Sequence, residues 1–173
     1  MEAHLARFES VLASQHGLVT LDQLRDGQLS DGQMRTLVDQ KVLRRLRPRV
    51  FGLVGARDSW ERGLLAVVLS RQGSVASHAS AARLWKFEPR PEDRYEVTAG
   101  RDYRAPMRGV VLHRSATLGD EDVVQRDGIA CTSFERTLCD CTTLLSEYQL
   151  GRVLDDGMRR GVASLRRLTQ IFQ

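Results

Sequence analysis

Residues 30–54 constrain the fold more than any other part of the chain, because a helical pattern runs directly into a basic alternating pattern. Ser30 and Gln33 have the spacing of a capping box at the start of a helix. Apolar residues follow at helical intervals and form one stripe: Met34, Leu37 and Val38. This half of the segment therefore predicts an amphipathic helix.

The second half of the segment has the pattern of a β-hairpin. Apolar and basic residues alternate over residues 42–54, and Pro48-Arg49 interrupts them as a tight turn would. Between Lys41 and Arg57 there are six basic residues and no acidic residue. A helix followed by a basic hairpin is typical of the recognition helix and wing of a winged helix-turn-helix.

The residues before this segment complete that order of elements. Residues 4–15 carry apolar side chains at helical spacing, residues 18–19 can form a short connecting strand, and Thr20 can cap a helix over residues 21–25. Asp26-Gly27 then supplies a turn. We therefore predict a winged helix-turn-helix DNA-binding domain over residues 1–57.

Residues 58–173 predict a second domain of mixed composition. Helices are expected near residues 60–72, 77–85, 133–145, 147–160 and 163–172, and a loop at residues 88–93. Strands are expected near residues 95–98 and 110–113, and Asp127-Gly128 has the signature of a hairpin turn. The predicted fold class is α+β: an N-terminal winged helix-turn-helix, then a small α/β domain with mixed or antiparallel strands and C-terminal helices.

The charge is distributed unevenly between the two predicted domains. Residues 1–57 hold nine basic and six acidic residues, whereas residues 58–173 hold 17 and 16. Arginine outnumbers lysine by 24 to 2, which suits phosphate recognition but also follows from a GC-rich coding bias. The basic excess therefore favours a nucleic-acid surface on the first domain.

The cysteines and the hydropathy of the chain indicate where in the cell the protein is expected. The chain has three cysteines, Cys131, Cys139 and Cys141, and its N-terminus lacks the pattern of a secretory signal. An odd number of clustered cysteines indicates reduced thiols and a cytoplasmic protein. No apolar run approaches the roughly 20 residues that a membrane span requires.

The predicted DNA contacts fall on the helix and the hairpin. Glutamine and arginine side chains can read base edges, and a run of wing arginines can bind phosphates. Arg35 and Asp39 are also four residues apart and could simply form an ion pair. The predicted DNA-binding residues are Ser30, Gln33, Arg35, Thr36, Gln40, Lys41, Arg44, Arg45, Arg47 and Arg49.

The sequence predicts no catalytic residue, metal site or cofactor. Cys139 and Cys141 point to different sides of a helix, and no second ligand pair has zinc spacing. Ser77 is interpreted as a helix cap, and His113 lies on a strand without a spaced carboxylate. A metal-dependent nuclease motif is matched only at residues 39–41, which fall on the end of a helix instead of a strand.

Several blocks of sequence, taken together in order and spacing, resemble one bacterial family. The blocks are His-Gly-Leu-Val-Thr at 16–20, Arg-Leu-Arg-Pro-Arg-Val-Phe at 45–51, Ser-His-Ala-Ser-Ala-Ala-Arg-Leu-Trp at 77–85, Val-Leu-His-Arg-Ser at 111–115 and Asp-Gly-Ile-Ala-Cys-Thr-Ser-Phe-Glu-Arg-Thr-Leu-Cys-Asp at 127–140. They are similar to the AbiEi-type antitoxins and transcriptional regulators of type IV toxin–antitoxin (abortive-infection) systems. Two positions depart from the pattern: Arg49 stands where a wing glycine is common, and Phe134 where a proline is common.

The resemblance implies a winged helix that binds the operator of its own operon, together with an α/β domain. The expected function is that of a cytoplasmic, DNA-binding transcriptional repressor and autoregulating antitoxin, which counters a nucleotidyltransferase-like toxin without a stable complex. One alternative is a protein-interaction module. Another is the DNA-targeting front half of a longer protein with a very-short-patch-repair-endonuclease-like domain, since this chain ends on a helical pattern about where such a domain would begin.

Overall fold

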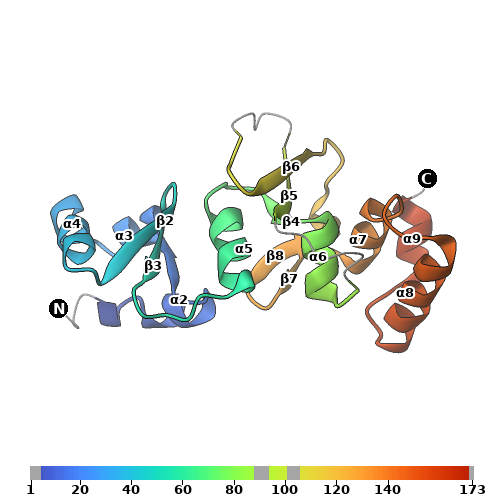
Figure 1. Cartoon of the computed structure of the whole chain (residues 1–173), viewed down its shortest axis with the longest axis horizontal. Coiled ribbons are helices and arrows are strands. Elements are labelled where there is room, and N and C mark those ends of the chain that lie inside the picture. The colour runs from blue at the N-terminus through green and yellow to red at the C-terminus, as the bar shows by residue number, and fades with distance from the viewer. Residues whose placement is uncertain (1–4, 88–93, 101–105, 172–173) are drawn as a thin grey trace. The chain divides into compact units, whose positions relative to one another are not determined.

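The computed structural model describes residues 5–87, 94–100 and 106–171 (Figure 1). The fold is α+β, as predicted, and it divides into two compact units, residues 1–72 and 73–173. The division follows Gln72 instead of the predicted Arg57, because helix α5 (Trp60–Leu69) belongs to the first unit. The loop predicted at residues 88–93 lies outside the described residues, as do the ends of the first and last predicted helices.

The first unit combines short helices with one antiparallel sheet. Its other elements are α2 (Glu9–Ser14), β1 (Leu18–Thr20), α3 (Leu21–Asp26), α4 (Asp31–Asp39), β2 (Leu43–Arg47) and β3 (Val50–Leu53). The strand order is β1-β3-β2. The buried core contains Phe8, Val19, Leu24, Leu29, Met34, Leu37 and Leu43.

Reciprocal caps define where α3 and α4 begin. The Ser30 hydroxyl accepts a hydrogen bond from the Gln33 backbone N–H at 3.2 Å, and the Gln33 side chain accepts one from the Ser30 N–H at 2.9 Å. Thr20 and Gln23 form the same arrangement before α3. The predicted capping box is therefore confirmed, and it satisfies backbone donors that a helix N-terminus leaves unpaired.

The hairpin of β2 and β3 turns at Pro48 and Arg49. Proline favours the first central position of a tight turn, and Arg49 takes the left-handed φ of +62° that the second position of a type II turn requires. Glycine adopts this conformation without strain, whereas arginine has a Cβ that opposes it. The sequence departure at Arg49 therefore falls on the residue of the turn where glycine is conformationally favoured.

Helix α5 is joined to the hairpin through a buried arginine. The Arg62 side chain is 2% exposed and donates hydrogen bonds to the carbonyl oxygens of Leu53 at 2.9 Å and Ala56 at 3.1 Å. A Cβ on Gly52 would lie 2.5 Å from Nη2 of Arg62, so only glycine leaves room for the guanidinium. Arg62 thus connects α5 with the strand that follows the turn.

The second unit is built on a mixed five-stranded sheet. Its elements are β4 (Val75–Ala76), α6 (His78–Trp85), β5 (Tyr95–Ala99), β6 (Val110–Arg114), β7 (Val123–Arg126), β8 (Ile129–Thr132), α7 (Phe134–Asp140), α8 (Glu147–Arg159) and α9 (Leu165–Ile171), with a short 3-10 turn at Asp120–Asp122. The strand order is β6-β5-β4-β8-β7. The pairs β5–β6 and β4–β8 are parallel, and the other neighbours are antiparallel.

In the second unit, the predicted hairpin turn is confirmed, whereas the start of α7 differs from the sequence pattern. Asp127 and Gly128 have φ values of +51° and +76°, as the predicted two-residue hairpin turn requires. Thr132 and Glu135 have the sequence spacing of a capping box, but the cap of α7 is Ser133, because its hydroxyl accepts the hydrogen bond from the Arg136 N–H. The Glu135 carboxylate accepts a hydrogen bond from the Ser164 N–H at 2.7 Å instead. Among the described residues, no helix is both long and apolar enough to cross a membrane.

Candidate nucleic-acid interface

Helix α4 buries one face and exposes the other. Met34 and Leu37 are buried in the core of the first unit, as their spacing predicts. The exposed positions of α4 and its C-terminal cap are Asp31, Gly32, Gln33, Arg35, Thr36, Asp39 and Gln40. Every predicted base-reading residue of this helix therefore reaches its exposed face.

Two of these side chains are already engaged by the helix itself. The Gln33 Oε1 accepts the Ser30 N–H, so the amide cannot offer both of its polar atoms to a base while it caps the helix. The Thr36 hydroxyl donates to the Gly32 carbonyl at 3.0 Å. Within the described residues, Arg35 forms no ion pair, and the alternative of an Arg35–Asp39 pair is not observed. Of the residues predicted to read bases on α4, Arg35 is therefore the one whose side chain is not engaged by the helix itself.

The predicted hairpin arginines fall into two classes. Arg44 forms an ion pair with Asp58 at 2.6 Å, and Arg49 forms one with Asp22 of α3 at 2.5 Å. Both acids lie outside residues 41–57, a segment whose charged residues are all basic. The tertiary structure therefore brings the two acids to the hairpin. Arg45 is exposed and, in the described part of the chain, has no ion pair.

Strand alternation places Arg45 on the face of the hairpin that carries the core. Arg45 pairs in register with Phe51, and Phe51 packs against the core cluster that includes Leu43 and residues of α4. Arg44 pairs with Gly52 instead and shares the face occupied by Arg62. Because successive side chains of a strand point to opposite faces, Arg45 lies on the side of α4 and Arg44 on the side of α5.

Asp58 is shared by two arginines. Its Oδ1 lies 2.6 Å from Nη2 of Arg44 and 2.7 Å from Nη1 of Arg62. The hydrogen bond from Arg44, followed by the charge of Arg44 and the contacts of Arg62, lowers the pKa of the Asp58 carboxyl below its ordinary value of 3.8. A phosphate that binds Arg44 must therefore compete with an ionised carboxylate.

The remaining predicted residues lie around the end of α4. Gln40 is the C-terminal cap, and Lys41 follows with a left-handed φ of +56°; both are exposed. Ser30 and Arg47 complete the set, Ser30 as the cap of α4 and Arg47 half-buried at the end of β2. Chemically, the surface offers exposed guanidinium and ammonium donors, which suit anionic ligands such as phosphates.

A polar cluster in the second unit changes the interpretation of Ser77 and His113. The side chain of Ser77 makes no capping hydrogen bond; its Oγ accepts one from Thr98 at 2.8 Å and lies 3.0 Å from Nδ1 of His78. His113 has a carboxylate partner after all, because Nε2 lies 2.7 Å from Oε2 of Glu96. Burial, the largest cause, lowers the pKa of His78. No local spacing predicts this cluster, since Glu96 and His113 meet only through parallel strand pairing.

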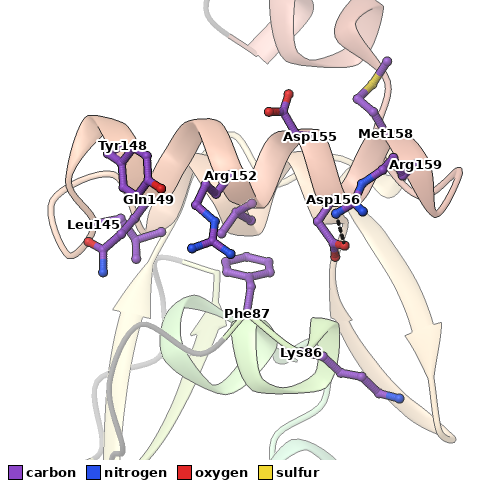
Figure 2. A pocket seen from close by; sticks show the side chains of 11 residues that line it. Lys86, Phe87, Leu145, Tyr148, Gln149, Arg152, Asp155, Asp156, Met158 and Arg159 are labelled. Atoms are coloured by element: carbon purple, nitrogen blue, oxygen red, sulfur yellow. Dashed lines mark hydrogen bonds and ion pairs between the residues drawn. The ribbon is translucent and has the colours of Figure 1, made fainter.

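A groove of about 940 Å³ lies between α8 and the end of α6 (Figure 2). Phe87 faces it from the segment after α6, while Arg152 and Tyr148 face it from α8. Tyr148 is 73% exposed and Met158 is 43% exposed, so two large apolar side chains of the groove are open to solvent. These residues were not singled out by sequence, because helical spacing alone does not separate a core stripe from an exposed one.

Comparison with known proteins establishes a similar fold. No protein-family model and no curated protein matches the sequence. Three chains of solved structures match, among them the RV2827C protein from Mycobacterium tuberculosis. Its crystal structure superposes with a TM-score of 0.56 at 19% identity, over 97% of this chain and 70% of that chain. At this identity, the likeness concerns the fold alone.

Proposed function

We propose that the first unit is a winged helix-turn-helix that binds double-stranded DNA, and that the protein is a cytoplasmic bacterial transcriptional regulator. The observation that carries this proposal is the capped helix α4, with Arg35 exposed, followed directly by a hairpin whose Arg45 lies on the same side. Helix, strand, two helices and a hairpin follow one another in the order of that motif. Arg35 is suited to base edges, and Arg45 to phosphates.

The sequence resemblance to AbiEi-type proteins supports a more specific role. In this proposal the protein is an antitoxin that represses its own operon, with its own operator as the DNA partner. It counters a nucleotidyltransferase-like toxin without forming a stable complex. The second unit would then serve the antitoxin activity, because three of the blocks that resemble this family lie in it, at residues 77–85, 111–115 and 127–140.

DNA binding is tested first, with the full chain. Fluorescence anisotropy should show that a labelled duplex from the region upstream of the gene binds more tightly than a shuffled duplex of the same composition. Arg45→Ala should weaken both and reduce the magnitude of the salt slope by about 0.9, the value for one phosphate contact. The control is Arg166→Ala, an exposed arginine of the second unit. An unchanged slope for Arg45→Ala, or an equal change for the control, would contradict the assignment.

The ion pair of Arg49 with Asp22 provides a variant that should increase DNA affinity instead of lowering it. Asp22→Asn removes the acid that neutralises Arg49 in an exposed pair, which contributes only about 0–1 kcal/mol to stability. If the hairpin contacts phosphates, this variant should bind DNA more tightly than the parent protein. Weaker or unchanged binding would place Arg49 outside the interface.

The antitoxin role is tested in cells. Co-expression with the neighbouring nucleotidyltransferase-like gene should restore growth, and a reporter under the upstream promoter should be repressed. The double variant Arg35→Ala/Arg45→Ala should lose repression. Absence of any such neighbouring gene would remove the antitoxin part of the proposal and leave DNA binding to be judged separately.

A protein-interaction module is the second candidate, and the groove beside α8 is the observation that favours it (Figure 2). DNA binding distinguishes the two candidates. If the chain does not bind DNA at low salt, it would be assigned to the protein-interaction modules. The nuclease alternative depends on the length of the open reading frame. Its one motif match, Asp39-Gln40-Lys41, lies at the C-terminal end of α4.

A further inference from the structure

Three side chains with metal-binding atoms converge in the second unit, far from the proposed DNA surface in sequence. His78 begins α6, Glu96 lies on β5 and His113 lies on β6. One ligand atom from each lies within 4.8 Å of the others. In the described ranges, this is the one such group of three.

The geometry inside the group is close and ordered. Nε2 of His113 lies 2.7 Å from Oε2 of Glu96, and Glu96 is almost entirely buried. The rings of His78 and His113 are stacked, with centroids 3.5 Å apart and planes inclined by 9°. A His–carboxylate hydrogen bond accounts for His113 and Glu96, but it does not account for a second imidazole held against the first.

A carboxylate lies behind His78 with one oxygen unsatisfied. Asp140 is 10% exposed, and its Oδ1 accepts a hydrogen bond from Nε of Arg136 at 2.9 Å. Its Oδ2 is buried, has no hydrogen-bond partner and lies 3.9 Å from Nδ1 of His78. Metal-binding histidines commonly direct their second ring nitrogen to a carboxylate, which orients the ring and increases its basicity. Asp140 and Ser77 both lie beside Nδ1 of His78 and correspond to such orienting groups.

The backbone at His78 is also unusual. His78 has a left-handed φ of +49° at the first residue of α6, a conformation that residues with a Cβ adopt at a cost of about 1–3 kcal/mol. Such strain persists only where the surroundings impose it. Here it places the imidazole against His113.

We propose that His78, Glu96 and His113 bind a divalent transition-metal ion of the Zn²⁺ class. Two imidazoles and one carboxylate are the donor set that zinc accepts in sites with three protein ligands, and such sites keep a fourth position open. Zinc–nitrogen bonds of about 2.0–2.1 Å require ligand atoms roughly 3.3 Å apart, so atoms that lie within 4.8 Å must approach by up to about 1.5 Å. The two stacked rings must also turn so that one nitrogen of each points to the ion. The ion replaces the proton between Glu96 and His113, and Asp140 and Ser77 orient His78.

The site connects three elements, which gives it a structural consequence. An ion bound by α6, β5 and β6 joins the first helix of the unit to the edge pair of the sheet. Because the unfolded chain lacks this arrangement, binding stabilises the folded state. The thermal midpoint of the full chain should therefore rise with Zn²⁺ in excess.

The test uses the full chain after treatment with a chelator. Competition with a chromophoric chelator should give one Zn²⁺ per chain, and Co²⁺ should give the absorption of a four- or five-coordinate site. His113→Ala and Glu96→Gln should abolish both the binding and the rise in thermal midpoint. Asp140→Asn should weaken binding by about 10–100-fold, the effect of losing an outer carboxylate. Mg²⁺ should compete poorly, because it prefers all-oxygen sites.

Two matched controls separate this site from other donors. Cys139→Ser removes the most accessible thiol, and His16→Asn removes a histidine of the first unit while keeping a residue that tolerates its left-handed φ of +52°. Both should leave the zinc affinity unchanged. Loss of binding in either control, or full binding in His113→Ala, would overturn the proposal.

A measurement on the unmodified chain avoids variants that fold poorly. Diethyl pyrocarbonate modifies accessible imidazoles, and peptide mass spectrometry locates the adducts. Zn²⁺ should protect His78 and His113 and leave the modification of His16 unchanged. Equal modification of all three with and without Zn²⁺ would show that these side chains do not ligate the ion, and DNA binding by the first unit would be unaffected by that result.

Discussion

At the scale of single residues, Arg62 shows how one buried charge is accommodated. Its guanidinium reaches two backbone carbonyls, at Leu53 and Ala56, and one exposed carboxylate, at Asp58. These bonds satisfy Nη1 and Nη2, whereas the buried Nε has no hydrogen-bond partner, and Gly52 supplies the space that the side chain needs. The sequence contains 24 arginines, and nothing in local spacing marks this one as buried.

Arg62→Ala should therefore destabilise the folded state by about 2–4 kcal/mol, through the loss of its hydrogen bonds to two carbonyls and of the packing of the side-chain stem. Arg57→Ala is the matched control, because Arg57 is exposed, and its substitution should change stability by less than about 0.5 kcal/mol. Urea unfolding followed by circular dichroism measures both. Equal effects would show that the burial of Arg62 contributes nothing specific.

The cysteines give a second prediction at this scale. Burial, the largest cause, raises the pKa of Cys131 to about 12 and that of Cys141 to about 12. Because the thiolate is the reactive form, a disulfide reagent at pH 8 should label these two only after unfolding, and Cys139 should react first in the folded chain. The pKa of Cys131 in the folded chain lies above the unfolded value of 9.0, so burying the neutral thiol favours the folded state. This contribution to the free energy of unfolding is fully present below pH 9 and is lost as the pH rises toward 12. Rapid labelling of Cys131 in the folded chain would contradict the prediction.

At the scale of elements, helix α4 separates residues that sequence treats alike. The Gln33 side chain caps the helix, and the Thr36 hydroxyl donates to a backbone carbonyl. Arg35 forms no ion pair with any described residue. The hairpin makes a similar distinction, since Arg44 and Arg49 form ion pairs with acids from other segments, whereas Arg45 forms none with any residue that the structure describes. The proposed interface is therefore smaller than the ten predicted residues suggest.

Arg35→Ala should cost about 1–3 kcal/mol on the preferred DNA site and little on random DNA, the signature of base reading. Gln33→Ala serves as the comparison. It should lower protein stability by roughly 0.5–1 kcal/mol through loss of the cap and weaken binding equally on both DNAs. Titrations of both variants on both duplexes decide between them. A sequence-dependent loss for Gln33→Ala alone would reverse the assignment.

At the scale of the whole molecule, the first unit extends to Gln72 because α5 is part of it. Residues 1–57 alone contain fewer than 60 residues, and domains of that size bury a modest fraction of their surface. Helix α5 contacts β1 and β2 of this unit, and Arg62 is inserted beside Gly52.

A fragment of residues 1–72 should therefore unfold at a higher temperature than a fragment of residues 1–57. The longer fragment keeps Ser59, which caps α5, and Arg62, which donates to the carbonyl at the end of β3 and to that of Ala56. Thermal unfolding of the two fragments beside the full chain, with DNA titrations of each, makes the comparison. Identical midpoints and affinities for both fragments would show that α5 does not support the hairpin.

How much was predictable depends on the range of the interaction. Capping at Ser30, the Asp127-Gly128 turn, the apolar stripe of α4 and the α+β class follow from sequence alone, because each depends on residues within a few positions of one another. The boundary at Gln72, the ion pair of Arg49 with Asp22 and the junction of His78, Glu96 and His113 were decided only by the tertiary structure. These contacts join residues 17 or more positions apart, and strand pairing and helix packing, which no local pattern encodes, determine which such residues meet.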